Sequence, residues 1–410
     1  MQSKKSHKAH WANQLVLMAG LLFPVAAVHG QTSGSIALRA EVHQPLVAAQ
    51  EALKINQPEQ ALSRTREALK VAQLTSAERT VVLRTQAVAA LRAQNWEVAI
   101  EALEFLVSSP EVTATDRLPL FESLMTVGQQ KKDHAMVVKW AREYLKEGGP
   151  KPTVRVVMIQ TLAVMGEHKQ VVSEMQEKLR LDVAAGLKTP EQELRILAVS
   201  YRQLKDSAGY GSTLRRLLES YPSKAYWAEV IQRLAQHVNL NPRLELDLYR
   251  LLDQTDSLEE AGDYTEMAQL ALKAGLPAEA LRVMAKGYEA GLLGKGVDGV
   301  AHNKLRTEAQ KKAQEDERNF AQFERAAQDS TAWAGVGDVY ASQQNWGAAN
   351  VAYDKALALG GLRREPEFRL HYAISLIKAG QKDAARQQLD AVQGDALTME
   401  LAGLWRLLAR

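Results

Sequence analysis

The residues that could serve phosphate or metal chemistry lack the spacing that this chemistry needs. A phosphate-binding loop requires regularly spaced glycines, a Ser or Thr after its lysine and a preceding strand, and the segment Gly294 to Gly296 meets none of these requirements. No two histidines after residue 30 have the three- or four-residue spacing of a zinc site on a helix. These histidines are His43, His134, His168, His237, His302 and His371. We therefore expect no metal site and no cofactor.

Paired acidic residues could act as general acid and base, but those of this chain lie in helical charge runs. Glu259 with Glu260, and Asp316 with Glu317, have Lys or Arg nearby, which is typical of a solvated helix face. No nucleophile elbow is present. We expect a protein that is not an enzyme and has no catalytic residue. The alternative is an enzyme whose site lies in the irregular segment 287–329.

The composition is typical of a folded protein without disulfides and without excess charge. Of the 410 residues, 46% are hydrophobic, 24% are charged and none is cysteine. This excludes thiolate catalysis, Cys-ligated zinc and an N-terminal lipid-modified cysteine. Beyond residue 30 there are 48 basic residues (51 less Lys4, Lys5 and Lys8) and 48 acidic residues. Because binding to nucleic acid or to an anionic membrane surface needs excess positive charge, this balance predicts neither.

The first thirty residues have the pattern of a secretory signal. Three lysines precede an apolar run from Leu15 to Phe23, and small residues follow. We expect a signal peptide over residues 1–30, cleaved after Gly30 or after Ala27, and a periplasmic protein. An uncleaved anchor is the alternative, although the run is shorter than the roughly 20 residues that span a bilayer. We expect membrane association only through such an anchor or through a partner.

From Gln44 onward the sequence predicts helices, which must position any binding residue. Apolar residues recur at three and four positions, and no stretch alternates as a strand would. The helices repeat at about every 35 to 39 residues, each repeat with a small residue where two helices can cross closely. This small residue is found at Ala61, Ala99, Ala280, Ala349 and Ala385. Weaker units are centred near Met136, Val171 and Tyr210, and two double steps predict degenerate units around 227–252 and 305–327.

The clearest repeat begins at Ser330 and resembles a tetratricopeptide repeat (TPR). That family's pattern of Trp, Leu, Gly, Tyr, Ala, Phe and Ala is matched, with two conservative replacements, by Trp333, Val336, Gly337, Tyr340, Ala349, Tyr353 and Ala356. We expect Gly337 and Ala349 where the helices cross, with tyrosines filling the space beside them. The resemblance implies an all-α superhelical solenoid of stacked antiparallel helix hairpins.

The repeats predict three regions after the signal. A TPR-like helical array is expected over residues 31–290, and a degenerate linker with a charged helix over 291–329. TPR units are expected again over 330–410. The glycine-rich stretch from Gly287 to Gly299 marks the seam between the two arrays.

The TPR resemblance implies a partner-binding groove lined by the first helix of each hairpin. The positions in phase with this surface are Lys54, Arg84, Arg92, Arg195, Arg202, Gln269, Lys273, Asp338 and Lys378. Since basic residues predominate, we expect the groove to bind an acidic segment of a protein or peptide. Trp227 is a further candidate, as an exposed aromatic anchor for a partner.

The chain is also similar to exported proteobacterial repeat proteins associated with energy-transducing TonB systems, through the element Tyr221 to Trp227. This similarity implies a non-catalytic scaffold of the cell envelope that serves a TonB-type transport system. The alternative is an accessory subunit of polysaccharide or pilus export machinery, in which similar repeat domains bind a synthase or a secretion pore.

Overall fold

A computed structural model of the chain describes residues 38–236 and 244–410, and the predicted signal peptide lies outside these residues. Within the described residues the regular elements are 20 helices, α1 to α20, and no strand is present. None of the helices in this part of the chain combines the length and hydropathy needed to cross a bilayer. The prediction of an all-α solenoid of helix hairpins is confirmed.

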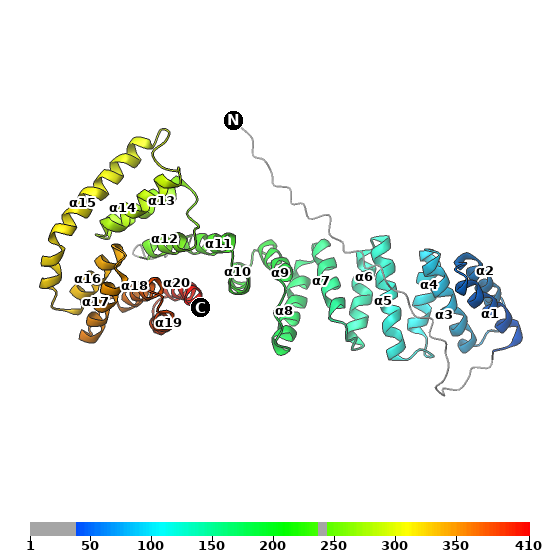
Figure 1. The fold of residues 1–410 in the computed structure, drawn as a ribbon. Helices are drawn as coiled ribbons and strands as arrows, with labels where there is room; N and C mark the ends of the chain where they lie inside the picture. Colours follow the sequence, from blue (N-terminus) through cyan, green and yellow to red (C-terminus); the bar gives the residue numbers. More distant parts are fainter. Residues whose placement is uncertain (1–37, 237–243) are drawn as a thin grey trace. The chain divides into compact units, whose positions relative to one another are not determined.

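The described residues belong to two compact units, Met1–Pro150 and Lys151–Arg410 (Figure 1). The first unit contains α1 (Ala40–Lys54), α2 (Pro58–Leu69), α3 (Ser76–Arg92), α4 (Trp96–Ser108), α5 (Ala114–Lys131) and α6 (His134–Lys146). The second unit contains α7 (Pro152–Val164), α8 (His168–Ala184), α9 (Glu191–Gln203), α10 (Ser207–Ser220), α11 (Lys224–Ala235), α12 (Glu245–Gln254), α13 (Ala261–Lys273), α14 (Pro277–Glu289), α15 (Gly299–Ala326), α16 (Ser330–Ser342), α17 (Trp346–Leu359), α18 (Glu365–Lys378), α19 (Lys382–Asp390) and α20 (Ala396–Leu408).

Most helices pair with the next helix in a hairpin. Among the described residues, α1 to α14 form seven consecutive pairs, and α16 with α17 and α18 with α19 form two more. Two helices, α15 and α20, remain outside these pairs. Because α15 is a single helix of 28 residues, the prediction of a degenerate hairpin over 305–327 is wrong. No glycine or proline interrupts the chain from Lys304 to Ala326, and intrahelical ion pairs such as Lys312 to Glu308, at 2.9 Å, favour one long helix.

Four of the hairpins share one form of turn. A residue in the left-handed region, with φ between 56° and 62°, ends the first helix at Gln94, Lys132, Lys205 and Gln344. The next residue caps the second helix, because its side-chain oxygen accepts a backbone N–H of the first turn that would otherwise be unpaired. These caps are Asn95, Asp133, Asp206 and Asn345. Two of these four turns have the sequence Gln-Asn-Trp, at residues 94–96 and 344–346.

The hairpin of α16 and α17 has close helix packing at the positions of the TPR pattern. Ala349 is fully buried, and a Cβ atom on Gly337 would lie 2.5 Å from the ring of Tyr353, so only glycine fits there. The other pattern residues in or against the same cluster are Trp333, Tyr340 and Ala356. Small and large side chains thus alternate across this crossing.

The second unit closes on itself, which stacking of neighbouring hairpins alone does not require. One hydrophobic cluster joins side chains of α9 to α12 with side chains of α18 to α20, including Leu217, Leu248, Leu370 and Trp405. Figure 1 shows α18 and α20 beside α11 and α12. Helices far apart in the sequence therefore share one core.

Trp227 belongs to this core and is not an exposed anchor. Its side chain is 7% exposed. Trp227 begins an apolar stripe on α11 that continues three, four and seven residues later with Val230, Ile231 and Leu234, all of them buried in the same cluster. This helical periodicity is the sequence signal that points to burial.

Candidate functional site

The predicted partner-binding positions are exposed in the structure, with the exception of Asp338. The first unit carries Lys54, Arg84 and Arg92, and the second unit carries Arg195, Arg202, Gln269, Lys273, Asp338 and Lys378. Each unit therefore carries its own set of predicted partner-binding positions. The structure brings together two groups in the second unit: Arg195 with Arg202, and Asp338 with Lys378.

The positions in the first unit already have contacts within the chain. Arg92 of α3 donates a hydrogen bond of 2.9 Å to the Leu53 carbonyl at the end of α1. Arg84 of the same helix lies 3.5 Å from Asp116 in the first turn of α5. These two arginines therefore link consecutive first helices, and their charges are in part used to hold the array together.

In the second unit, α9 and α11 carry a surface rich in Arg and Tyr, which we call the Arg–Tyr face. Arg195 and Arg202 are exposed and lie seven residues apart on α9, so they share one side of the helix. Tyr226 of α11 is partly buried beside them and donates a hydrogen bond of 2.7 Å to Glu191 of α9. Arg and Tyr are the residue types most enriched among the energetically dominant positions of protein interfaces.

Burial and then the neighbouring Glu191 raise the pKa of Tyr226 to about 12. Burial and then Glu229 have the same effect on Tyr210, whose pKa is also about 12. Both hydroxyls therefore remain protonated at neutral pH. The Arg–Tyr face therefore presents the neutral Tyr226, bonded to Glu191, beside the cations Arg195 and Arg202, while Tyr210 belongs to the second helix α10.

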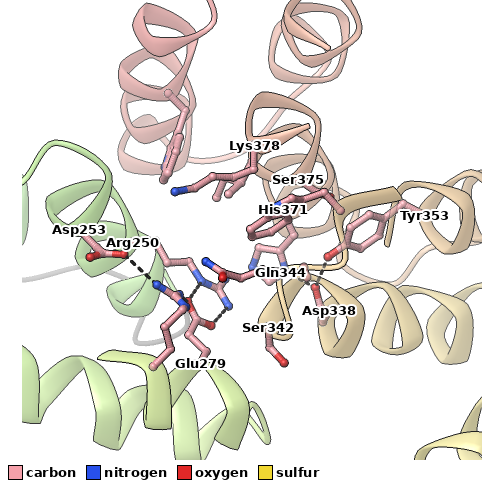
Figure 2. Close-up of a pocket in the computed structure, with 15 residues that line it drawn as sticks. Arg250, Asp253, Glu279, Asp338, Ser342, Gln344, Tyr353, His371, Ser375 and Lys378 are labelled. Carbon is pink, nitrogen blue, oxygen red and sulfur yellow. Dashed lines mark hydrogen bonds and ion pairs between the residues drawn. The ribbon is translucent and has the colours of Figure 1, made fainter. Parts of the chain in front are cut away.

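A pocket with a cavity volume of about 40 Å³ lies inside the second unit, between α12, α14, α16, α17, α18 and α20 (Figure 2). Its polar lining residues are Arg250, Asp253, Glu279, Arg282, Asp338, Ser342, Gln344, Tyr353, His371, Ser375, Lys378 and Trp405. The pocket exists because the last helices of the chain pack on α12 and α14. We call it the closure pocket.

On one side of the closure pocket, His371 of α18 lies between two carboxylates. Its Nδ1 is 2.9 Å from Asp338 of α16, and its Nε2 is 3.3 Å from the fully buried Asp247 of α12. Burial by itself lowers the pKa of His371, but the charges of Asp247 and Asp338 outweigh it and raise this pKa to about 10. Because both ring nitrogens face acceptors, the imidazole is a cation that donates to both.

On the opposite side, Arg250 of α12 forms a two-bond contact with Glu279 of α14, at 2.9 and 2.7 Å. Its remaining nitrogen lies 2.8 Å from Asp247. Asp253 accepts from Arg282 at 3.2 Å and from Lys286 at 2.8 Å. Each carboxylate of the closure pocket therefore has at least one cationic partner.

Three hydrogen-bond donors of the closure pocket have no acceptor in residues 38–236 and 244–410. The Nε atom of Arg282 and the Nε1 atom of Trp405 are buried and have no hydrogen-bond acceptor there. Lys378 extends from α18 into the pocket (Figure 2) and forms no ion pair within these residues. Desolvation, then the positive charges of Arg282 and Lys286, lower its pKa, although Asp253 opposes the shift.

His371 and the aspartates in and behind the closure pocket are unsuited to acid–base chemistry, whereas the pKa of Lys378 is shifted toward neutral pH. A general acid or base works best with a pKa near the working pH, whereas the pKa of His371 is about 10 and those of Asp247, Asp253 and Asp338 are lowered. Within the described part of the chain, no group of three His, Asp or Glu side chains could hold a metal ion.

The sequence did not predict this pocket as a site. The repeat pattern predicted Asp338 and Lys378 only as positions in a groove. It did not predict His371, Arg250 or Glu279 as binding residues. The partners come from helices far apart in the chain: His371 and Asp247 are separated by 124 positions. A local signal exists only for Asp247 and Arg250, which have the spacing of an ion pair on one helix.

Comparison with known proteins gives distant structural likenesses alone. No protein-family model matches the chain, and no curated protein matches it. A solved structure of the TPR2AB domain of yeast Sti1 in a pHSP90 complex is 13% identical and covers 66% of this chain and 98% of its own, with a TM-score of 0.33. Yeast Tom70 is 11% identical and covers 90% of this chain and 95% of its own, with a TM-score of 0.26. A TPR protein from Parabacteroides merdae is 10% identical and covers 82% of this chain and 99% of its own, with a TM-score of 0.27.

Two of these three solved structures, those of Sti1 and of the Parabacteroides merdae protein, are described as TPR structures. The hairpins and capped turns of the chain itself define its fold.

Proposed function

We propose that the protein is a non-catalytic TPR scaffold, and that its Arg–Tyr face binds an acidic segment of a protein partner. The observation that carries the proposal is the exposure of Arg195 and Arg202 on one side of the first helix α9, next to Tyr226 of the first helix α11. Arginine binds carboxylates with paired, charge-assisted hydrogen bonds. An acidic partner segment lying across α9 and α11 would contact both arginines.

The place of action that we propose is the periplasm, with the partner in a TonB-type transport system. Support for export comes from the lysines and the apolar run in residues 1–30, and support for the TonB association comes from the element Tyr221 to Trp227. Two residues of that element stabilise the fold, since Tyr221 donates to the Thr189 carbonyl at 2.9 Å and Trp227 lies in the core. The identity of the bound partner distinguishes this role from that of an accessory subunit in polysaccharide or pilus export.

Reversing the charge of the Arg–Tyr face tests the proposal. The double variant Arg195→Glu with Arg202→Glu is expected to bind the partner at least tenfold more weakly, a change of about 1.4 kcal/mol in binding free energy. Its melting temperature should stay close to that of the wild type, because exposed charges contribute little to stability. Added salt should also weaken wild-type binding, since exposed charges are screened over about 10 Å at 0.1 M.

The matched control is Lys169→Glu with Arg216→Glu, which makes the same change in net charge on exposed positions of the second helices α8 and α10. Affinity is measured by titration calorimetry with the partner recovered by crosslinking. Equal affinities of the two double variants would show that the Arg–Tyr face is not the binding surface.

A further inference from the structure

The donors of the closure pocket outnumber the acceptors available to them. Each carboxylate that lines the pocket already accepts from a cation. Arg282 Nε and Trp405 Nε1 are buried without an acceptor in the described residues, and Lys378 has no ion pair there. A buried donor without an acceptor costs about 1–3 kcal/mol, and the great majority of such groups in folded proteins are paired. The group that would complete the hydrogen bonding of the pocket is therefore an acceptor.

Charge and size narrow the class of this acceptor. With His371 protonated, the lining has four cations, namely Arg250, Arg282, His371 and Lys378, against three carboxylates, which leaves one net positive charge. Behind the lining, the carboxylate of Asp247 and the ammonium of Lys286 offset each other. The cavity volume of about 40 Å³ holds roughly three water-sized groups, at about 10–15 Å³ each. A carboxylate group has three heavy atoms, one negative charge and about four lone-pair positions for donors.

We propose that the closure pocket binds the carboxylate group of a small organic acid, held by Lys378 Nζ, Arg282 Nε and Trp405 Nε1. This goes beyond protein binding, and it does not depend on the Arg–Tyr face. The three donors come from α14, α18 and α20, so the ligand ties the last helices to the earlier part of the second unit. A ligand that binds only the folded form stabilises it by mass action.

Acetate is the probe that tests this site, and uncharged acetamide, with the same shape, is its control. The indole N–H resonance of Trp405 in a nitrogen-15 spectrum reports on the pocket directly, and its absence from the spectrum of Trp405→Phe identifies it. We expect this resonance to shift with acetate and to stay in place with acetamide, or with chloride at equal ionic strength. An unmoved resonance in acetate, or equal shifts with acetamide or chloride, would overturn the proposal.

The variant Lys378→Met tests the contribution of the ammonium group while it keeps the apolar stem. Acetate affinity is expected to fall at least tenfold in Lys378→Met and to stay unchanged in Lys304→Met, which alters an exposed lysine of α15 outside the pocket. Both variants should fold, since Lys378 has no ion pair to lose in the described residues and Lys304 is exposed. Equal acetate affinities of Lys378→Met and the wild type would refute the assignment.

A chain end is a second source of the same chemical group. N-acetyl-Ala-Ala, which has a free C-terminal carboxylate, and its C-terminal amide are therefore titrated in parallel. Because the cavity holds only about three water-sized groups, we expect acetate to bind at least as tightly as the peptide. Tighter, Lys378-dependent binding of the peptide would replace the small acid with a protein terminus as the ligand.

Discussion

Replacing His371 with glutamine is expected to lower the free energy of unfolding of the second unit by about 3 to 5 kcal/mol, the usual cost of removing one partner from a buried charge pair. The imidazolium donates to Asp338 of α16 and to Asp247 of α12, and glutamine supplies no positive charge to either carboxylate. Asp247 has no exposed side-chain surface, so water cannot compensate for the loss. This contact links α18 to α12 and α16, beside the hydrophobic core that joins the same parts of the unit.

Because of the same contact, the stability of the wild-type protein is expected to decrease at alkaline pH. The pKa of His371 is raised from its ordinary value of 6.5 to about 10 in the folded protein. Its contribution to stability is therefore complete below pH 6.5 and is lost as the pH rises through 10. Over this window wild-type stability should fall by up to about 1.4 kcal/mol per pH unit, whereas the His371→Gln variant should show little of this change.

Thermal unfolding from pH 6.5 to pH 10, together with hydrogen exchange of α12, α16 and α18, measures both effects. The control is His134→Gln, which alters an exposed histidine of α6 in the first unit. A His371→Gln protein with wild-type stability and the wild-type pH profile would show that the Asp–His–Asp contact does not hold the unit together.

The variant Ala349→Leu is expected to destabilise the second unit by roughly 1 to 3 kcal/mol, because the crossing of α16 and α17 has no room for three added carbons. Ala349 is fully buried beside Tyr353 and Phe368, and its cluster extends to α18. Since α18 shares a second core with α10 to α12, the loss of hydrogen-exchange protection should reach these earlier helices. In an open array it would remain near the altered hairpin.

The matched control is Ala99→Leu, which alters the corresponding fully buried alanine on α4 of the first unit. Its effects should be confined to α1 to α6, and those of Ala349→Leu to the second unit. If Ala349→Leu left the protection of α10 to α12 unchanged, the closure of the second unit would not be cooperative.

Local patterns were sufficient to predict the helices and the repeat. The small residues at Gly337 and Ala349 and the Gln-Asn-Trp turns are determined within one hairpin, where packing and capping act between near neighbours. The course of α15 was missed because a spacing argument assumed a hairpin where uninterrupted helix formers make a single helix. The short motif that ends at Trp227 predicted an exposed side chain, but the apolar stripe that follows it on α11 places Trp227 in the core.

The closure pocket could not be predicted because no local pattern records it. The phase of Lys378 and Asp338 in the repeat predicted that they line a groove. In the structure both residues line the closure pocket. Asp247 and His371 meet only after the chain returns to α12, and Arg250 of α12 meets Glu279 in the next hairpin, on α14. Their ion pairs depend on the tertiary arrangement and leave no mark within any single repeat.

The central claim, that the Arg–Tyr face holds a protein partner, is tested most directly by site-specific photo-crosslinking in cells. A benzophenone amino acid is placed at position 202 on α9 and, as a control, at the exposed position 216 on the second helix α10. We predict a strong adduct between position 202 and an acidic segment of one protein, and little adduct from position 216. Adducts of equal yield from both positions, or an adduct from position 216 alone, would contradict the account.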